Sequence, residues 1–138
     1  MIASTDRPQN DGRPTVLIID DDDGIRDLYG HWFFAQGFQV MCAVGKEGLS
    51  LALRRERPDL IVTELKARDL CLTDLMNRLK SSDETRCIPV LVLTTSCDSK
   101  VLAETTVVGV VAVLPKLTDF GELRAWATAL IPNAKPRA

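Results

Sequence analysis

Five short apolar runs alternate with segments of helical periodicity, and this alternation limits the possible folds more than any other feature of the chain. Each run is an unbroken stretch of aliphatic and β-branched residues, which is typical of strands buried on both faces. The runs are Val16–Ile19, Phe38–Met41, Leu60–Val62, Ile88–Leu93 and Val110–Leu114. Strands that alternate with helices through right-handed crossovers form a parallel sheet with helices on both faces. We therefore predict a single-domain α/β fold with a doubly wound, five-stranded parallel sheet.

The segments between the runs place apolar residues at helical spacing. The first helix has an apolar face formed by Ile25, Leu28, Tyr29, Trp32 and Phe33. It should end at Gly37, with Phe34 exposed on its opposite side. The other helices are expected from Lys46 to Glu56, from Leu72 to Leu79, from Asp98 or Ser99 to about Val107, and from Thr118 or Asp119 to Pro132.

The length of 138 residues suits one domain, which we place at residues 15–131. Residues 1–14 and 132–138 are polar and rich in proline, and we expect them to be flexible arms. The formal net charge of −2 gives no general attraction to nucleic acid or to an anionic membrane. No apolar run approaches the roughly 20 residues of a membrane span, and no signal-peptide pattern is present, so we expect a cytoplasmic protein. The four cysteines form no CxxC pair, and we expect reduced, mostly buried thiols.

A run of four aspartates, Asp20 to Asp23, follows the first apolar stretch directly. Adjacent carboxylates resist ionising together unless a cation compensates them, and Mg²⁺ is the usual partner for such a group. The alternative is an acidic turn that caps the following helix. The position favours a binding role, because ligands of open α/β sheets lie at the carboxyl ends of the strands.

Three further polar side chains follow other predicted strands and should reach the same edge of the sheet: Glu64, Thr94 and Lys116. Each alone is a weak signal, since strands commonly end in a polar residue. Together, metal-binding carboxylates, a hydroxyl and an ammonium group that converge on one further carboxylate are typical of a phosphoryl-transfer site.

These residues resemble a known family, the receiver domains of two-component response regulators, over essentially all of residues 15–131. The first strand with its acidic pair is similar in Val16–Asp22, and the lead-in to the phosphoacceptor is similar in Pro58–Thr63. Ile88–Thr95 resembles the fourth strand with its switch hydroxyl, and Gly109 keeps the family's spacing to Lys116. The resemblance implies the flavodoxin-like receiver fold and a role in phosphorelay signalling rather than an enzyme activity.

The resemblance also implies roles for the strand-end residues. Asp20 and Asp21, together with the acceptor position, would bind Mg²⁺, Thr94 would hydrogen-bond the phosphoryl group, and Lys116 would pair with it. Family members carry aspartate at the acceptor position, whereas this chain has Glu64. The extra methylene moves the carboxylate by roughly 1.5 Å, and a misplacement of about 1 Å can cost around 100-fold in rate. Glu64 also carries a permanent charge toward Thr94 and Lys116, as a phosphoryl group would.

Other positions depart from the family pattern. The Met-Pro and Gly that usually follow the acceptor fall on Ala67, Arg68 and Leu72. The proline that usually follows the lysine is missing, and Pro115 precedes Lys116 instead, with Leu117 after it. The aromatic switch residue of the last strand falls on Val113. We therefore favour a degenerate receiver, or pseudo-receiver, that acts through protein interactions without the usual phosphorylation.

Two other hypotheses remain at this stage. The chain could be a phosphorylated receiver that uses another carboxylate, Asp21 or Asp69. It could also be a small Mg²⁺-dependent phosphohydrolase with Asp20 as nucleophile and Asp22 as acid and base. The metal question is separate, because Asp20, Asp21 and Glu64 could bind Mg²⁺ or could instead be neutralised by Lys116 or Arg68.

The expected partners are proteins, either a histidine kinase or an effector, and no nucleic acid or membrane. The resemblance places the interaction surface on the fourth helix, last strand and fifth helix, where a homodimer is also possible. The charged residues on that surface are Lys100, Glu104, Glu122 and Arg124. No output domain is expected after residue 131, so the chain would be a stand-alone module.

Overall fold

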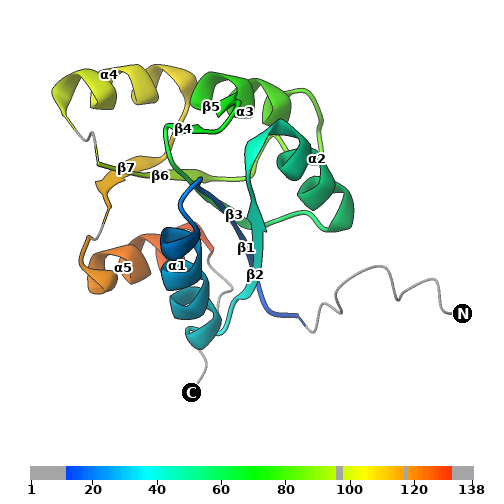
Figure 1. Cartoon of the computed structure of the whole chain (residues 1–138), viewed down its shortest axis with the longest axis vertical. Helices are drawn as coiled ribbons and strands as arrows, with labels where there is room; N and C mark the ends of the chain where they lie inside the picture. The colour runs from blue at the N-terminus through cyan, green and yellow to red at the C-terminus, as the bar shows by residue number, and fades with distance from the viewer. Residues whose placement is uncertain (1–11, 96–97, 117, 132–138) are drawn as a thin grey trace, which may run out of the picture.

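The computed structural model describes residues 12–95, 98–116 and 118–131. Its centre is a parallel sheet of five strands in the order β2-β1-β3-β6-β7 (Figure 1). The strands are β1 (Thr15–Ile19), β2 (Gln39–Ala43), β3 (Leu60–Thr63), β6 (Val90–Thr94) and β7 (Ala112–Pro115). The predicted doubly wound α/β fold is confirmed.

Five helices cover the two faces of this sheet. They are α1 (Asp23–Ala35), α2 (Gly45–Arg55), α3 (Leu72–Lys80), α4 (Ser99–Val108) and α5 (Phe120–Leu130). Figure 1 shows α1 and α5 on one side of the sheet and α2, α3 and α4 on the other. The predicted helices are therefore all present, with ends that differ by a few residues at most.

Alternate side chains of the central strands divide the apolar core into two clusters. Leu17 and Ile19 of β1 pack on the side of α2 and α3, whereas Val16 and Ile18 pack on the side of α1 and α5. Because successive side chains of a strand point to opposite faces, one fully buried strand supplies both clusters. The unbroken apolar run of β1 follows from this burial on both faces.

The side chains of three aspartates begin helices, as capping preferences predict. Asp22 accepts a hydrogen bond from the backbone N–H of Ile25 at the start of α1. Asp98 and Asp119 cap α4 and α5 in the same way. Gly109 ends α4 with a φ of 95°, a left-handed conformation that glycine adopts without a steric penalty.

Burial at the edges of the sheet differs from the sequence prediction. The edge strands β2 and β7 are mostly half-buried or exposed, because each has a neighbouring strand on one side only. Leu28, expected on the buried face of α1, is 41% exposed. Phe34 is exposed as predicted, with Arg13 stacked over its ring.

A small antiparallel hairpin between β3 and α3 was not predicted from the sequence. It consists of β4 (Lys66–Ala67) and β5 (Leu70–Cys71), and the backbone N–H of Leu72 donates to the carbonyl oxygen of Leu65 at 2.9 Å. Arg68 turns the hairpin with a φ of 60°. The sequence of this segment lacks the turn residues that are usual in receiver domains, and the chain forms a different turn here.

The prediction of mostly buried cysteines is wrong for the cysteines that the structure describes. Cys42 and Cys87 are exposed and Cys71 is half-buried, and all three are free thiols. Cys97 and Leu117 lie outside the described residues, as do most of the two arms predicted at residues 1–14 and 132–138. Within the described ranges, no helix has the length and apolar character needed to cross a membrane.

Candidate functional site

The carboxyl ends of the parallel strands bring four of the sequence-predicted residues to one edge of the sheet. Asp20 directly follows β1 and Glu64 directly follows β3, while Thr94 is the last residue of β6 and Lys116 follows β7. The backbone N–H of Lys116 donates to the carbonyl oxygen of Thr94 at 2.9 Å, which places the lysine beside β6. The expected convergence is thus present in the folded chain.

Lys116 lies between two carboxylates at the centre of this site. Its Nζ is 3.0 Å from Oδ2 of Asp20 and 2.8 Å from Oε2 of Glu64. The three side chains are only 14%, 7% and 14% exposed, for Lys116, Asp20 and Glu64 respectively. Burial alone would lower the pKa of Lys116, but the hydrogen bonds and charges of Glu64 and Asp20 outweigh it and raise the pKa. The ammonium group is therefore held in its charged form.

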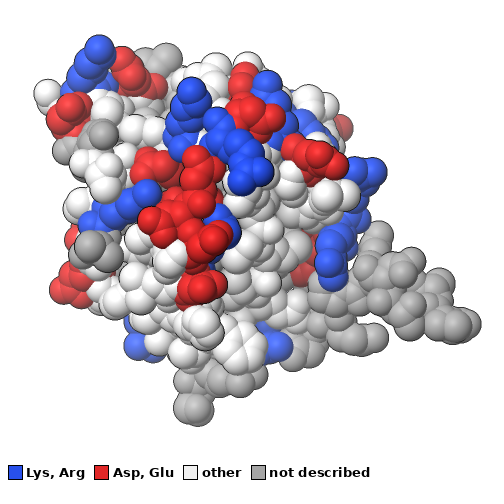
Figure 2. Space-filling view, viewed as in Figure 1, with Lys and Arg blue, Asp and Glu red and all other residues white. Residues whose placement is uncertain are grey.

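Backbone and side-chain donors fix the acidic turn that precedes α1. The backbone N–H of Asp22 donates to Oδ1 of Asp20 at 2.9 Å. Arg26 donates from Nη1 to the carbonyl oxygen of Asp20 at 2.5 Å and forms an ion pair with Asp23. Figure 2 shows acidic side chains gathered where β1 ends and α1 begins, with basic side chains around them. Asp20 is thus a site residue, whereas Asp22 and Asp23 stabilise the start of α1.

Glu64 has both carboxylate oxygens engaged. Oε1 accepts a hydrogen bond from the backbone N–H of Leu65 at 2.7 Å, while Oε2 faces Lys116. The backbone N–H of Glu64 donates to the carbonyl oxygen of Ile19 at 3.0 Å, which ties the residue to β1. The longer glutamate side chain is therefore held close to the strand end and directed at the lysine.

The other two candidate carboxylates are held by different groups. Oδ2 of Asp21 accepts a hydrogen bond from the backbone N–H of Arg68 at 2.8 Å. Oδ1 of Asp69 accepts one from the backbone N–H of Lys46 at 2.8 Å, at the start of α2. A Cβ at Gly45, whose φ is 75°, would come within 2.7 Å of the same oxygen, so this contact requires glycine. The side chain of Arg68 also lies beside Gly45.

The three carboxylates expected to bind Mg²⁺ do not form a ligand set in this arrangement. Lys116 is placed between Asp20 and Glu64, and Asp21 faces the hairpin. Over the described ranges, no three or more His, Cys, Asp or Glu side chains are gathered in a way that could hold a metal ion. A divalent cation prefers several oxygen ligands and is repelled by an ammonium group between them. The geometry therefore fits an internal lysine better than a metal.

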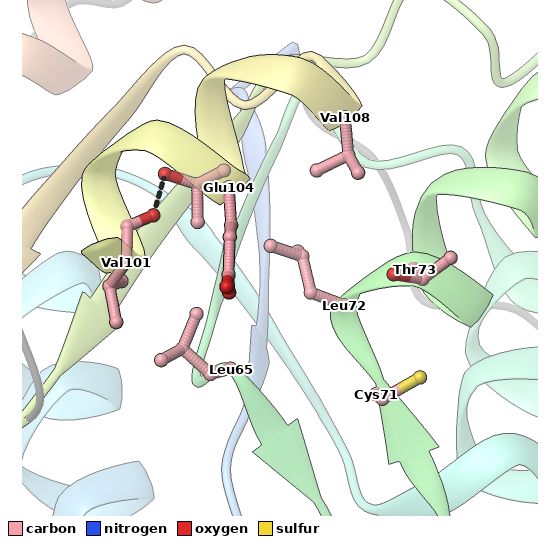
Figure 3. Close-up of a pocket in the computed structure, with 8 residues that line it drawn as sticks. Leu65, Cys71, Leu72, Thr73, Val101, Glu104 and Val108 are labelled. Atoms are coloured by element: carbon pink, nitrogen blue, oxygen red, sulfur yellow. Dashed lines mark hydrogen bonds between the residues drawn. The ribbon is translucent and has the colours of Figure 1, made fainter.

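A hollow of about 490 Å³ lies next to the site, between α4 and the segment from β3 to α3. Figure 3 shows Leu65 and Leu72 facing α4 across it, with Glu104 and Val108 on the helix side. The hydroxyl of Thr105 donates to the carbonyl oxygen of Val101 at 2.8 Å, within the helix. Because Leu65 also donates its backbone N–H to Glu64, the hollow adjoins the site through one residue.

Comparison with known proteins identifies the family. The model of the response regulator receiver domain matches residues 16–128. The chain belongs to the response regulator receiver domain family. Sporulation initiation phosphotransferase F of Bacillus subtilis is 29% identical to this receiver domain over 118 residues, which are 85% of this chain and 93% of that protein. The transcriptional regulatory protein AfsQ1 of Streptomyces coelicolor is 35% identical over 86 residues, 62% of this chain but only 36% of AfsQ1.

Solved structures show the same fold. The response regulator receiver protein from Pseudomonas putida superimposes with a TM-score of 0.76 at 24% identity and covers 87% of this receiver domain and 99% of its own chain. The chemotaxis response regulator CheY4 of Vibrio cholerae has a TM-score of 0.77 at 20% identity, with 86% and 98% covered. At these identities the likeness shows the fold. The family match places the chain in two-component signalling, where receiver domains interact with histidine kinases and effectors.

The sequence did not predict how two residues contribute to the site of this receiver domain. Arg26 was given no role there, and Arg68 was considered only as a possible counter-ion. Arg26 binds the backbone of Asp20 from the first turn of α1, and the backbone of Arg68 binds Asp21. A signal for Arg26 existed, because it lies one turn beyond the cap residue Asp22 and follows an acidic run. The contact from Arg68 depends on a left-handed backbone at a residue other than glycine, for which the sequence offers no signal.

Proposed function

We propose that this receiver domain signals through protein contacts with its site held by Glu64 and Lys116, rather than through an aspartyl phosphate. One observation carries the proposal: Nζ of Lys116 lies 2.8 Å from Oε2 of Glu64 and 3.0 Å from Oδ2 of Asp20. The lysine that would pair with a phosphoryl group is already paired with the side chain at the acceptor position. The family membership supports a signalling role for this arrangement.

Two properties of Glu64 disfavour phosphoryl transfer. Its carboxylate stands roughly 1.5 Å farther from the backbone than that of aspartate, and in-line attack is sensitive to about 1 Å. Its two oxygens are also engaged by Leu65 and Lys116, so attack would require both contacts to break. In the resting chain, Glu64 supplies the negative charge that Lys116 would otherwise receive from a phosphoryl group. We infer that the domain is held in one signalling state by this internal charge.

Phosphorylation on a different carboxylate has less support. Asp21 faces the backbone of Arg68, and Asp69 faces the start of α2, so neither is paired with Lys116. The phosphohydrolase hypothesis needs Asp20 as a nucleophile and Asp22 as an acid and base. Asp20 is bound to Lys116, and Asp22 caps α1.

The test is incubation with a small-molecule phosphodonor and Mg²⁺, followed by intact-mass measurement. Wild-type protein should show no adduct, because Glu64 is misplaced for attack and bound to Lys116. The variant Glu64→Asp restores the family's acceptor, and we expect it to gain a hydroxylamine-sensitive adduct. Glu64→Gln is the matched control, since it keeps the length of the side chain without the nucleophile. A stoichiometric adduct on wild-type Glu64, Asp21 or Asp69 would overturn the proposal.

The protein partner would bind the face formed by α4, β7 and α5. The four charged residues predicted on this face are all exposed: Lys100, Glu104, Glu122 and Arg124. Leu102 on α4 and Val111 before β7 are also exposed, at 44% and 42%. We expect a histidine kinase, an effector or a second copy of the chain here. A pull-down from the native cell that compares wild type with Glu64→Asp should retain different partners if the site controls this face.

A further inference from the structure

A second charged region lies at the opposite edge of the sheet from the receiver site. Here α2 and α3 end, β3 begins, and the chain turns back toward β6, so the region is separated from Asp20 and Lys116 by the length of the strands. Figure 1 shows the segment between α3 and β6 running beside α2, and Figure 2 shows Lys and Arg side chains at the rim of the molecule where α2 lies. A cavity of about 460 Å³ opens between these elements.

The charged lining of this cavity is dominated by arginine. It contains four guanidinium groups and two carboxylates, a local excess of two positive charges: Arg54, Arg55, Arg57, Arg78, Glu56 and Glu84. The remaining lining is mostly polar, and Leu53 is its apolar member. A cavity of this size is within the range of small-molecule sites. Because it has no aromatic side chain, it offers no stacking platform for a nucleobase.

Two of the arginines have no partner among the residues that the structure describes. Throughout residues 12–95, 98–116 and 118–131, the side chains of Arg55 and Arg78 form no ion pair and no hydrogen bond. Arg78 is nevertheless half-buried. Arg55 is exposed to solvent. A guanidinium carries five N–H donors in a fixed fork, and in the half-buried Arg78 water reaches only part of them. These donors indicate that an external acceptor completes the cavity.

Helix capping does not account for Arg78. A basic side chain in the last turn of a helix can bind the free carbonyl groups there. At the end of α3, the carbonyl oxygen of Arg78 already accepts from the hydroxyl of Ser81 at 2.6 Å, and that of Leu79 accepts from the hydroxyl of Thr85 at 2.6 Å. Hydroxyl groups therefore bind two of the carbonyl groups at the helix end, and the guanidinium of Arg78 binds none of them.

Arg57 gives the cavity a fixed wall. Its Nε donates to the carbonyl oxygen of Glu84 at 2.7 Å, its Nη1 donates to that of Pro58 at 3.3 Å, and Asp59 lies 3.8 Å away. The residue thus ties the end of α2 to the segment between α3 and β6. A ligand that enters would therefore meet one fixed guanidinium, while the side chains of Arg55 and Arg78 remain free to turn toward it.

We propose that this cavity binds a phosphate-bearing small anion of di- or triphosphate size, through Arg55 and Arg78 as forks on phosphate oxygens. Guanidinium groups bind phosphate in a bidentate manner, which favours arginine over lysine at such a site. The two carboxylates in the lining, Glu56 and Glu84, disfavour a long acidic peptide, whose side chains would approach them. Because the lining contains no aromatic side chain, we expect it to recognise only the phosphate groups of a ligand and not a nucleobase. This site is separate from the receiver chemistry and does not depend on the proposed role of Glu64.

The experiment is calorimetric titration of the full chain with inorganic triphosphate at about 50 mM and about 300 mM salt, because the screening length falls from roughly 14 Å to roughly 6 Å between these strengths. We expect one saturable site that weakens at the higher salt. Arg55→Ala with Arg78→Ala should reduce the affinity at least about tenfold, since each charged hydrogen bond lost costs about that factor. The affinity of Arg55→Lys with Arg78→Lys should lie between those of wild type and the double alanine variant, because the charge remains and the fork is lost.

The control for each single substitution, Arg55→Ala or Arg78→Ala, is Arg124→Ala, which removes one positive charge from the exposed surface of α5. It should leave the affinity within about twofold, as expected for a screened remote charge. Amide shifts on binding should map to residues 53–57 and 78–85 and leave Asp20, Glu64 and Lys116 unmoved. ADP should bind about as well as pyrophosphate if only phosphate is recognised.

Several results would overturn the proposal. They are the absence of saturable binding, an equal loss in Arg124→Ala, shifts that map to Thr94 and Lys116, or a glutamate hexapeptide that binds more tightly than triphosphate. Circular dichroism of every variant establishes that a loss of affinity is not a loss of fold.

Discussion

At the carboxyl edge of the sheet, Lys116 lies between Asp20 and Glu64 and forms an ion pair with each, whereas at the opposite edge Arg55 and Arg78 line a cavity with no partner among the described residues. The first region is buried and its charges satisfy one another. The second is open, and its charges face the solvent in excess. A cluster of charged side chains is therefore not by itself a sign of a binding site, because an internal counter-ion removes the need for a ligand.

The largest expected effect is at the buried lysine. Lys116→Met should lower the free energy of unfolding by about 3 kcal/mol, because it leaves two buried carboxylates without a counter-ion. Chemical denaturation followed by circular dichroism measures the change. Combining Lys116→Met with Glu64→Gln should recover part of the loss, since one of the two charges is then removed. A loss below about 0.5 kcal/mol, typical of an exposed ion pair, would break the contrast between the two regions.

The pH dependence of stability should follow the raised pKa of Lys116. A group whose pKa is higher in the folded state stabilises the fold fully below its unfolded value, about 10.4, and loses this effect as the pH rises through the folded pKa. The stability difference between wild type and Lys116→Met should therefore be constant from about pH 7 to 9 and narrow above about pH 10.5. Denaturation midpoints across this range test it. A difference that vanished below pH 9 would contradict the raised pKa.

Removal of the lysine should make the acidic site a better metal site. In Lys116→Met the positive charge between Asp20 and Glu64 is gone, and Mg²⁺ should bind at least about tenfold more tightly than in wild type. A titration of Mg²⁺ against the amide signals of Asp20 to Asp23 and Glu64 measures both affinities. Equal affinities would show that Lys116 does not compete with the metal.

The smallest effect is expected at the arginine cavity. Arg55→Ala should change the free energy of unfolding by no more than about 0.5 kcal/mol, because the side chain has no partner and lies among like charges. Chemical denaturation of Arg55→Ala, carried out together with Lys116→Met, measures this change in the free energy of unfolding. A loss approaching that of Lys116→Met would show that Arg55 has a structural role and is not reserved for a ligand.

Most of the fold could be predicted from the sequence, because the periods of the apolar residues determine the elements. The convergence of Asp20, Glu64 and Lys116 followed from the predicted parallel sheet, since the carboxyl ends of parallel strands share one edge. The sequence left open whether Glu64 contacts Lys116 or a metal. Periodicity predicts at which edge of the sheet a residue lies, but not where its side chain points.

Other features depend on tertiary neighbours or on backbone conformations that have no sequence signal. The half-burial of β2 and β7 reflects their edge positions in the sheet, which the apolar runs did not distinguish from central ones. The turn at Arg68 uses a left-handed backbone without glycine. The exposure of Cys42 follows from its place on the edge strand β2, whereas cysteine in general favours the interior.

Lys116 and Glu64 are in direct contact within a largely buried site. The most direct test is a double-mutant cycle of Lys116→Met and Glu64→Gln, with the free energy of unfolding measured for all four proteins at neutral pH. We expect a coupling energy of about 2 kcal/mol, within the range for contacting charged residues. Additive effects, with a coupling energy near zero, would contradict it.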